Sequence, residues 1–236
     1  MVLFFGAQLF CFFSGILATG ILHQAAVPGF RHTEDFGNIL VATLSFQGAT
    51  WLLIPIYLHL NEINWRDFFG LRTANALRAV GWAIAALIVL LPVAAGLERL
   101  SELGLQRLGW ESQPEEAVRL LLNAPLWPTG IYLGVFAIVL APVAEEFIFR
   151  GVLFPFVKQL GWPKMAWVGV SFLFALIHAS PGIFVPLFVL ALGLTWLYEK
   201  TGNLLASIVA HSLFNAANLV LLVLADELSR RLPVQS

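Results

Sequence analysis

The sequence predicts an all-α protein, a polytopic bundle of transmembrane helices with amphipathic helices at the membrane surface. Of its 236 residues, 59% are hydrophobic and only 11% are charged, whereas a soluble domain carries about 25% charged residues. Apolar runs close to the roughly 20 residues that a membrane-spanning helix needs recur along the whole chain, and the alternating pattern of a membrane β-barrel is missing. The net charge of -1 gives no indication of nucleic-acid binding.

We expect seven transmembrane spans. Their approximate limits are residues 2–22, 38–60, 79–96, 130–157, 165–179, 183–198 and 204–225. The connections 62–78 and 97–125 mix charged residues with aromatic or leucine side chains, which indicates amphipathic segments in the headgroup region. No linker separates two soluble domains, so we expect one integral membrane domain over residues 1–236, with the motif-bearing helices in 128–225.

The chain is expected to be a multi-pass integral membrane protein, in the plasma (inner) membrane if its source is prokaryotic. The first apolar run lacks a basic flank and is longer than a typical signal-peptide core, so we interpret it as a retained helix. A cleaved signal peptide is the alternative, since Ala25 and Ala26 follow the run. Basic residues divide six and six between the two sides of the predicted bundle, which barely decides the orientation; we expect the N-terminus inside.

The fourth predicted span contains three charged residues, Glu145, Glu146 and Arg150. Charges at the centre of a membrane helix cost roughly 2.5 to 3.5 kcal/mol each, so the three together cost about 7 to 10 kcal/mol. The apolar residues of the same span contribute about 5 to 10 kcal/mol in favour of insertion. The span is therefore marginal alone and needs polar partners or a wet cavity supplied by neighbouring helices.

Helical geometry separates the two glutamates. Glu146 and Arg150 are four residues apart and can form an ion pair on one face of the helix. Glu145 is rotated about 100° from Glu146 and about 140° from Arg150, so it is the carboxylate placed to face a site. A buried carboxylate near a histidine is how a base that activates water is commonly prepared.

Two other predicted spans contain histidines. Phe174 and His178 are four residues apart in the fifth span, and His211 and Asn215 are four apart in the seventh. Residues at this spacing share a helix face, and Ser207 and Asn218 extend the polar stripe of the seventh span. Such a stripe points toward protein or water, because lipid offers it no partner. The three spans could therefore converge on one site.

Three segments carry a family resemblance. EEFIFRG (residues 145–151), FALIH (174–178) and HSLFN (211–215) are similar to the EExxxR, FxxxH and HxxxN motifs of the CAAX-processing and bacteriocin-processing (CPBP, or Abi) intramembrane endopeptidases, which include prenyl-protein CAAX endopeptidases. All three motifs are intact and in the family's order. The resemblance covers about residues 141–218. Members of the family often have eight spans, whereas this sequence predicts seven.

The resemblance implies an activity and a role for each motif residue. Glu145, with His178, would position and deprotonate a water that attacks the scissile carbonyl, and His211 and Asn215 would donate hydrogen bonds to the oxyanion. Glu146 and Arg150 would support the site by fixing the helix. The substrate would be a membrane-associated protein or peptide; prenylated CAAX ends and bacteriocin leaders are both compatible with it.

Metal dependence has two possible answers. We expect no cofactor, because the sequence has no HExxH motif and each histidine is on a separate span. The alternative is a metalloprotease in which Glu145, His178 and His211 bind zinc, since the family has been described in both ways.

Two other classes of function fit the same polar residues. A non-proteolytic membrane protein, such as a binding partner or an immunity factor, could keep the constellation as a polar core, and His178 or Asn215 would then be structural hydrogen-bonding residues. A proton-coupled transporter is less favoured, because the sequence shows no matched halves with broken helices.

Overall fold

The computed structural model describes residues 2–28, 36–71, 75–110 and 130–231, and these residues form helices without a strand. Six helices are long and apolar enough to cross a membrane: Leu3–Gln24, Leu40–Leu60, Ala76–Arg107, Ile131–Gln159, Pro181–Thr201 and Leu204–Ala225. The predicted fold class, a polytopic all-α membrane protein, is confirmed. The described residues contain one fewer full-length span than the seven that the sequence predicts.

The difference lies in the predicted fifth span, residues 165–179. The corresponding helix is α10 (Pro163–Leu176), which has 14 residues. At 1.5 Å per residue it is about 21 Å long, which is shorter than the roughly 30 Å hydrocarbon core of a bilayer. The chain leaves the helix before His178 and turns at Ala179, whose φ is 50°, so His178 lies beyond the end of α10.

The first two spans pack together as a pair. They are α1 (Val2–Gln24) and a continuous helix made of α2 (Phe36–Thr43), the π-helical segment η1 (Leu44–Gly48) and α3 (Ala49–Leu60). The side chain of Gln8 in α1 donates hydrogen bonds to the Phe46 carbonyl at 2.8 Å and to Thr50 Oγ1 at 3.2 Å. These bonds satisfy polar groups where the two helices face each other within the membrane.

The third span is longer than the sequence predicts. Helix α5 (Ala76–Arg107) has 32 residues and is about 48 Å long, so it runs beyond the bilayer core. The predicted limit at residue 96 and the separate surface helix after it are therefore wrong for residues 97–107. Leu, Glu, Gln and Arg in this stretch are all good helix formers, so the helix continues after its apolar part and ends before Gly109, whose φ is 75°. The rest of the predicted surface segment, residues 111–125, lies outside the described residues.

In the other predicted surface segment, residues 62–78, the described residues contain the single helical turn α4 (Trp65–Phe68) and the beginning of α5. This segment is held against the start of α12 (Leu204–Arg231), because the Leu204 N–H donates to the Phe69 carbonyl at 3.0 Å. Gly70 follows with a φ of 63°, and a Cβ at this position would lie 2.0 Å from the Gly202 carbonyl oxygen. Both the backbone conformation and the close approach require glycine here.

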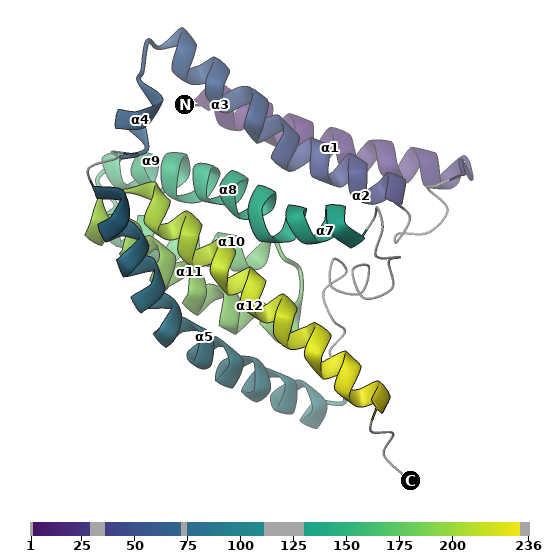
Figure 1. The fold of residues 1–236 in the computed structure, drawn as a ribbon. Coiled ribbons are helices and arrows are strands. Elements are labelled where there is room, and N and C mark those ends of the chain that lie inside the picture. The colour runs from purple at the N-terminus through teal and green to yellow at the C-terminus, as the bar shows by residue number, and fades with distance from the viewer. Residues whose placement is uncertain (1, 29–35, 72–74, 111–129, 232–236) are drawn as a thin grey trace.

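The motif-bearing fourth span is one continuous helix of 29 residues, Ile131–Gln159. Its segments are α7 (Ile131–Val135), the π-helical η4 (Phe136–Leu140), α8 (Ala141–Glu146), the π-helical η5 (Phe147–Leu153) and α9 (Phe154–Gln159). In Figure 1 this helix lies between the α1–α3 pair and the group formed by α5, α10, α11 and α12. Glu145, Glu146 and Arg150 are therefore covered by other helices.

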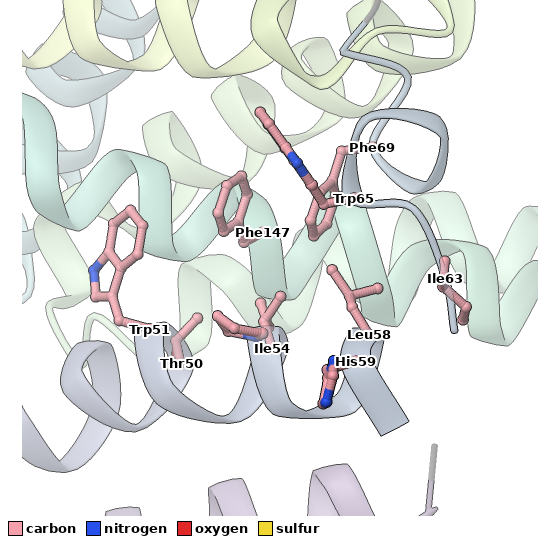
Figure 2. A pocket seen from close by; sticks show the side chains of 10 residues that line it. Thr50, Trp51, Ile54, Leu58, His59, Ile63, Trp65, Phe69 and Phe147 are labelled. Atoms are coloured by element: carbon pink, nitrogen blue, oxygen red, sulfur yellow. The ribbon is translucent and has the colours of Figure 1, made fainter. Parts of the chain in front are cut away.

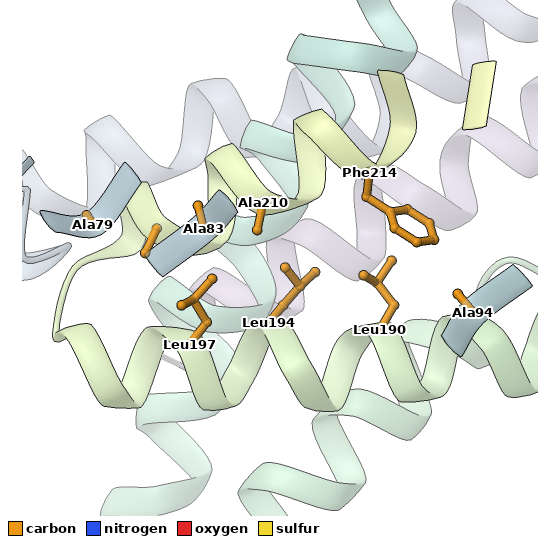
Figure 3. Close-up of a cluster of buried hydrophobic side chains, with 9 residues drawn as sticks. Ala79, Ala83, Ala94, Leu190, Leu194, Leu197, Ala210 and Phe214 are labelled. Carbon is orange, nitrogen blue, oxygen red and sulfur yellow. The ribbon is translucent and has the colours of Figure 1, made fainter. Parts of the chain in front are cut away.

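Helices α5, α11 (Pro181–Thr201) and α12 share a compact apolar core (Figure 3). Leucines of α11 point into it, and the facing positions of α5 and α12 are mostly small. The leucines are Leu190, Leu194 and Leu197, and the small residues include Ala79, Ala83 and Ala210. Small residues let helix backbones approach closely, which favours association in lipid. This core holds the helix that carries His211 and Asn215.

Candidate active site

The motif residues lie on four segments that meet inside the bundle. Glu145 and Glu146 end α8, Arg150 lies in η5, His178 follows α10, and His211 and Asn215 lie on α12. Glu146 and Arg150 have no solvent exposure, and Glu145 and His211 are also buried.

The ion pair predicted between Glu146 and Arg150 is confirmed. Arg150 Nη1 lies 2.8 Å from Glu146 Oε1. The guanidinium also donates from Nη2 to the Ala191 carbonyl at 3.1 Å and from Nε to Thr195 Oγ1 at 3.4 Å, both on α11. Its Cζ lies 4.6 Å from the centre of the Phe174 ring. A buried charge is tolerated when it is paired and its donors are satisfied, and Arg150 meets both conditions.

Glu146 has a second partner that the sequence did not predict. The same oxygen, Oε1, lies 3.0 Å from Nδ1 of His211 on α12. Since a carboxylate oxygen accepts, the histidine donates from Nδ1. A hydrogen bond to one ring nitrogen fixes the orientation of the imidazole and determines what Nε2 can do. Glu146 therefore positions His211 as well as Arg150.

Glu145 faces the other nitrogen of the same histidine. Its Oε2 lies 3.8 Å from His211 Nε2, which is too long for a hydrogen bond but close enough for a group of the reacting substrate to contact both. Two consecutive carboxylates thus face different nitrogens of one imidazole ring. The different directions of the two side chains agree with helix geometry, and the role of Glu145 stays a prediction.

His178 makes a local hydrogen bond. Its Nδ1 lies 2.7 Å from the Phe174 carbonyl oxygen, so Nδ1 donates, and in the neutral ring Nε2 would carry a lone pair. The Phe174 ring, which is fully buried, lies 4.9 Å from the His178 ring and 5.6 Å from the His211 ring, between centres. Phe174 is thus in contact with both histidines and with Arg150, and it keeps the two histidines in one neighbourhood.

Asn215 connects α12 to the fourth span. Its Nδ2 donates to the Ala137 carbonyl in η4 at 2.9 Å. Of the other stripe residues, Ser207 is fully buried and Asn218 is exposed, so the stripe faces the bundle at its N-terminal end and leaves it toward the C-terminus. The predicted site residues Glu145, His178 and His211 are therefore gathered together, with Asn215 one turn further along α12.

The side chains do not form a zinc site in this arrangement. In the described part of the chain, no three His, Cys, Asp or Glu side chains converge on a point that could bind a metal ion. The hydrogen bonds at Nδ1 of His178 and His211 leave Nε2 of each ring open, but these two nitrogens and Glu145 do not converge on one point. The zinc set Glu145, His178 and His211 does not fit without rearrangement, so the metalloprotease class has no support here.

Sequence reasoning missed the contribution of α11. Thr195 and the Ala191 carbonyl bind Arg150, and Thr195 Oγ1 also donates to Ala191 at 2.9 Å. Both residues lie in an apolar span, where a single threonine costs little and gives no signal. The full burial of Thr195 distinguishes it from a lipid-facing residue, and burial is visible only in the structure.

A cavity of about 420 Å³ lies on the other side of the fourth span, between α3 and the segment around α4 (Figure 2). Its lining is mostly apolar and includes Trp51, Trp65 and Phe147. Phe147 stacks on Phe69 with ring centres 4.5 Å apart, whereas the preceding residue, Glu146, contacts α12. The helix therefore separates this cavity from His178 and His211.

Comparisons with known proteins agree with the motif analysis. Residues 126–217 match the protein-family model Rce1-like, described as type II CAAX prenyl endopeptidase Rce1-like. The resemblance predicted from the three motifs is confirmed over this stretch. The UPF0177 protein YxdF of Lactococcus lactis subsp. lactis (strain IL1403) is 30% identical over 96 residues, which are 40% of this chain and 52% of that protein. The match thus spans about half the length of this curated relative. No solved structure matches the chain.

Proposed function

We propose that this chain, which is similar to the type II CAAX prenyl endopeptidases over residues 126–217, is an intramembrane endopeptidase that cleaves membrane-associated proteins or peptides. The observation that supports this most is the placement of the buried Glu145 carboxylate 3.8 Å from His211 Nε2, and the His211 and His178 rings both contact the Phe174 ring. An intramembrane carboxylate at this position is a functional group by default, because it is costly to keep there.

The proposed reaction is hydrolysis of a peptide bond by an activated water. Glu145 accepts a proton from the water, and the water oxygen attacks the carbonyl carbon of the substrate. His178 Nε2 carries a lone pair and orients the water by accepting its second hydrogen. When the C–N bond breaks, the proton held by Glu145 passes to the departing nitrogen. The products are a carboxylic acid and an amine, so atoms and protons balance.

The oxyanion role requires a particular protonation state of His211. Its Nδ1 proton is committed to Glu146, so Nε2 can donate only when the ring is an imidazolium. Burial of the ring and the nearby charge of Arg150 oppose that cation, and the negative charge of Glu146, which lies 3.0 Å away, favours it. Asn215 uses one hydrogen of Nδ2 for Ala137 and has a second for the oxyanion. Together the two side chains would stabilise the tetrahedral intermediate.

We also propose that the reaction needs no metal, since Glu145 supplies the base and the histidine and asparagine supply the electrophilic groups. The test is to measure cleavage by purified protein before and after treatment with a chelator, together with its metal content. Full activity in metal-free protein supports the proposal. Activity that is lost on chelation and restored by zinc would contradict it.

The test of the activity itself uses purified protein in detergent and a panel of membrane-anchored peptides, some ending in a prenylated CAAX sequence and some carrying a bacteriocin-type leader. Products are identified by mass spectrometry. Cleavage at a defined bond by the wild type, and by no sample lacking the protein, supports the proposal. A protein that binds members of the panel but cleaves none would instead be a binding or immunity protein with the same polar core.

A further inference from the structure

A second cavity lies away from the site described above, where α5 begins and α11 gives way to α12 (Figure 1). Its volume is about 220 Å³. The polar and aromatic residues that line it are Asn75, Arg78, Trp82, Lys200, Thr201 and Asn203. Two of these are cationic and none is a carboxylate, so the cavity has the charge to attract an anion.

The cations are on the rim of the cavity. Arg78 and Lys200 are both exposed, and the Lys200 ammonium lies 5.8 Å from the centre of the Trp82 ring. The neighbouring acid, Glu199, forms an ion pair with Lys158 and does not neutralise Lys200. Basic pockets between transmembrane helices at the membrane surface are typical binding sites for lipid headgroups.

The N-terminus of α5 adds the positive end of a helix dipole. Asn75 precedes this 32-residue helix and lines the cavity together with Arg78 and Trp82 of its first turns. The dipole favours an anion at this end of the helix. The start of α5 therefore adds to the positive charge of Arg78 and Lys200.

Asn203 supplies an independent indication of a ligand. Its side chain is 2% exposed and lines the cavity. The Oδ1 atom accepts from the Leu205 N–H at 2.9 Å and so caps α12, whereas Nδ2 has no hydrogen-bond partner. A buried donor without a partner is destabilising unless a ligand or water satisfies it.

We propose that this cavity binds a phosphate group, that of an anionic phospholipid at the membrane surface. Arg78 and Lys200 neutralise the phosphate, the start of α5 adds its helix dipole, and the Asn203 amide donates a hydrogen bond to it. Trp82 and Trp196, whose rings pack edge to face with centres 5.9 Å apart, lie beside the cavity as interfacial anchors do. The proposal does not depend on the endopeptidase activity.

The experiment measures the unfolding temperature of the full-length protein in detergent against increasing short-chain phosphatidylglycerol. A ligand that binds only the folded state raises this temperature in a concentration-dependent way, which gives an apparent Kd. Arg78→Gln and Lys200→Gln are each expected to weaken binding about 5-fold, and the double variant about 30-fold. Lys164→Gln, which removes an exposed lysine elsewhere, is the matched control and should bind like the wild type.

Two further ligands show whether the bound phosphate belongs to an anionic lipid or to a soluble molecule. Phosphatidylcholine should bind more weakly than phosphatidylglycerol, because its headgroup has no net charge. Inorganic phosphate that gives the same shift, with the same dependence on Arg78 and Lys200, would support the phosphate site and identify a soluble ligand as its source. Equal binding of the two lipids would overturn the proposal, as would a double variant that binds phosphatidylglycerol like the wild type.

Asn203→Asp tests the interior of the cavity. Aspartate keeps the oxygen that caps α12 at Leu205 but replaces the donor amide with a negative group. We expect that phosphatidylglycerol no longer raises the unfolding temperature of this variant, while the protein still unfolds cooperatively without lipid. Unchanged phosphatidylglycerol affinity in this variant would overturn the assigned role of Asn203.

Discussion

Nδ1 of His211 lies 3.0 Å from Oε1 of Glu146, the same oxygen that is 2.8 Å from Arg150 Nη1. One carboxylate oxygen of Glu146 therefore binds His211 on α12 and Arg150 on its own helix. Because Arg150 in turn donates to the Ala191 carbonyl of α11, the second glutamate of the motif is linked to α12 directly and to α11 through its ion pair with Arg150. Its position makes it both a structural residue and the residue that orients His211.

Glu146→Gln is expected to destabilise the protein strongly. The amide keeps the volume of the side chain but leaves Arg150 as a buried charge without its counter-ion, and breaking such a pair typically costs about 3 to 5 kcal/mol. The measurement is thermal or denaturant unfolding in detergent. Glu227→Gln removes an exposed pair with Arg231 and should change stability by less than about 1 kcal/mol. Equal stabilities for the two variants would contradict the importance of the buried pair.

Asn215→Leu is expected to lower the cleavage rate about 100- to 1000-fold, because it removes an oxyanion donor. The lost hydrogen bond to Ala137 should lower stability by only about 1 kcal/mol. Asn218→Leu is the control, since Asn218 is exposed on the same helix. The cleavage rate reports the role of Asn215 as an oxyanion donor, and the unfolding temperature reports its hydrogen bond to Ala137. A rate loss no larger than that of the control would show that Asn215 serves only to hold α12 against η4.

Gly70→Ala is expected to destabilise the connection between α4 and α12. The positive φ alone costs an L-residue about 1 to 2 kcal/mol, and the new Cβ would lie 2.0 Å from the Gly202 oxygen, so the backbone must move. The total should exceed about 2 kcal/mol. Gly81→Ala, inside α5 with open space around it, should instead stabilise by about 0.5 to 1 kcal/mol. Similar unfolding temperatures for the two variants would contradict this account.

The sequence predicted contacts that depend on spacing within one helix. The pair of Glu146 with Arg150 follows from the four-residue interval, and the burial of Ser207 and His211 follows from the polar stripe on an apolar helix. These inferences need only the geometry of an α-helix. They located the charged residues of the fourth span and their approximate directions.

Contacts between helices could not be predicted in the same way. The hydrogen bond of His211 to Glu146 depends on how α12 is rotated against α8, and the contribution of Thr195 depends on the position of α11. The predicted helix limits were also wrong where the local sequence signals for a helix end were weak. Helix α5 continues through a polar stretch of good helix formers, and α10 ends earlier than its apolar run because the chain turns at Ala179.

The most direct test of the central claim is the cleavage rate of Glu145→Gln, measured beside the wild type on one membrane-anchored peptide that the wild type cleaves. Removing a general base should lower the rate about 100- to 10,000-fold, with the unfolding temperature nearly unchanged, because Arg150 keeps its partner Glu146. Glu62→Gln, the same change at an exposed position, should retain the wild-type rate. Cleavage by Glu145→Gln within about tenfold of the wild type would contradict the assignment of Glu145 as the base.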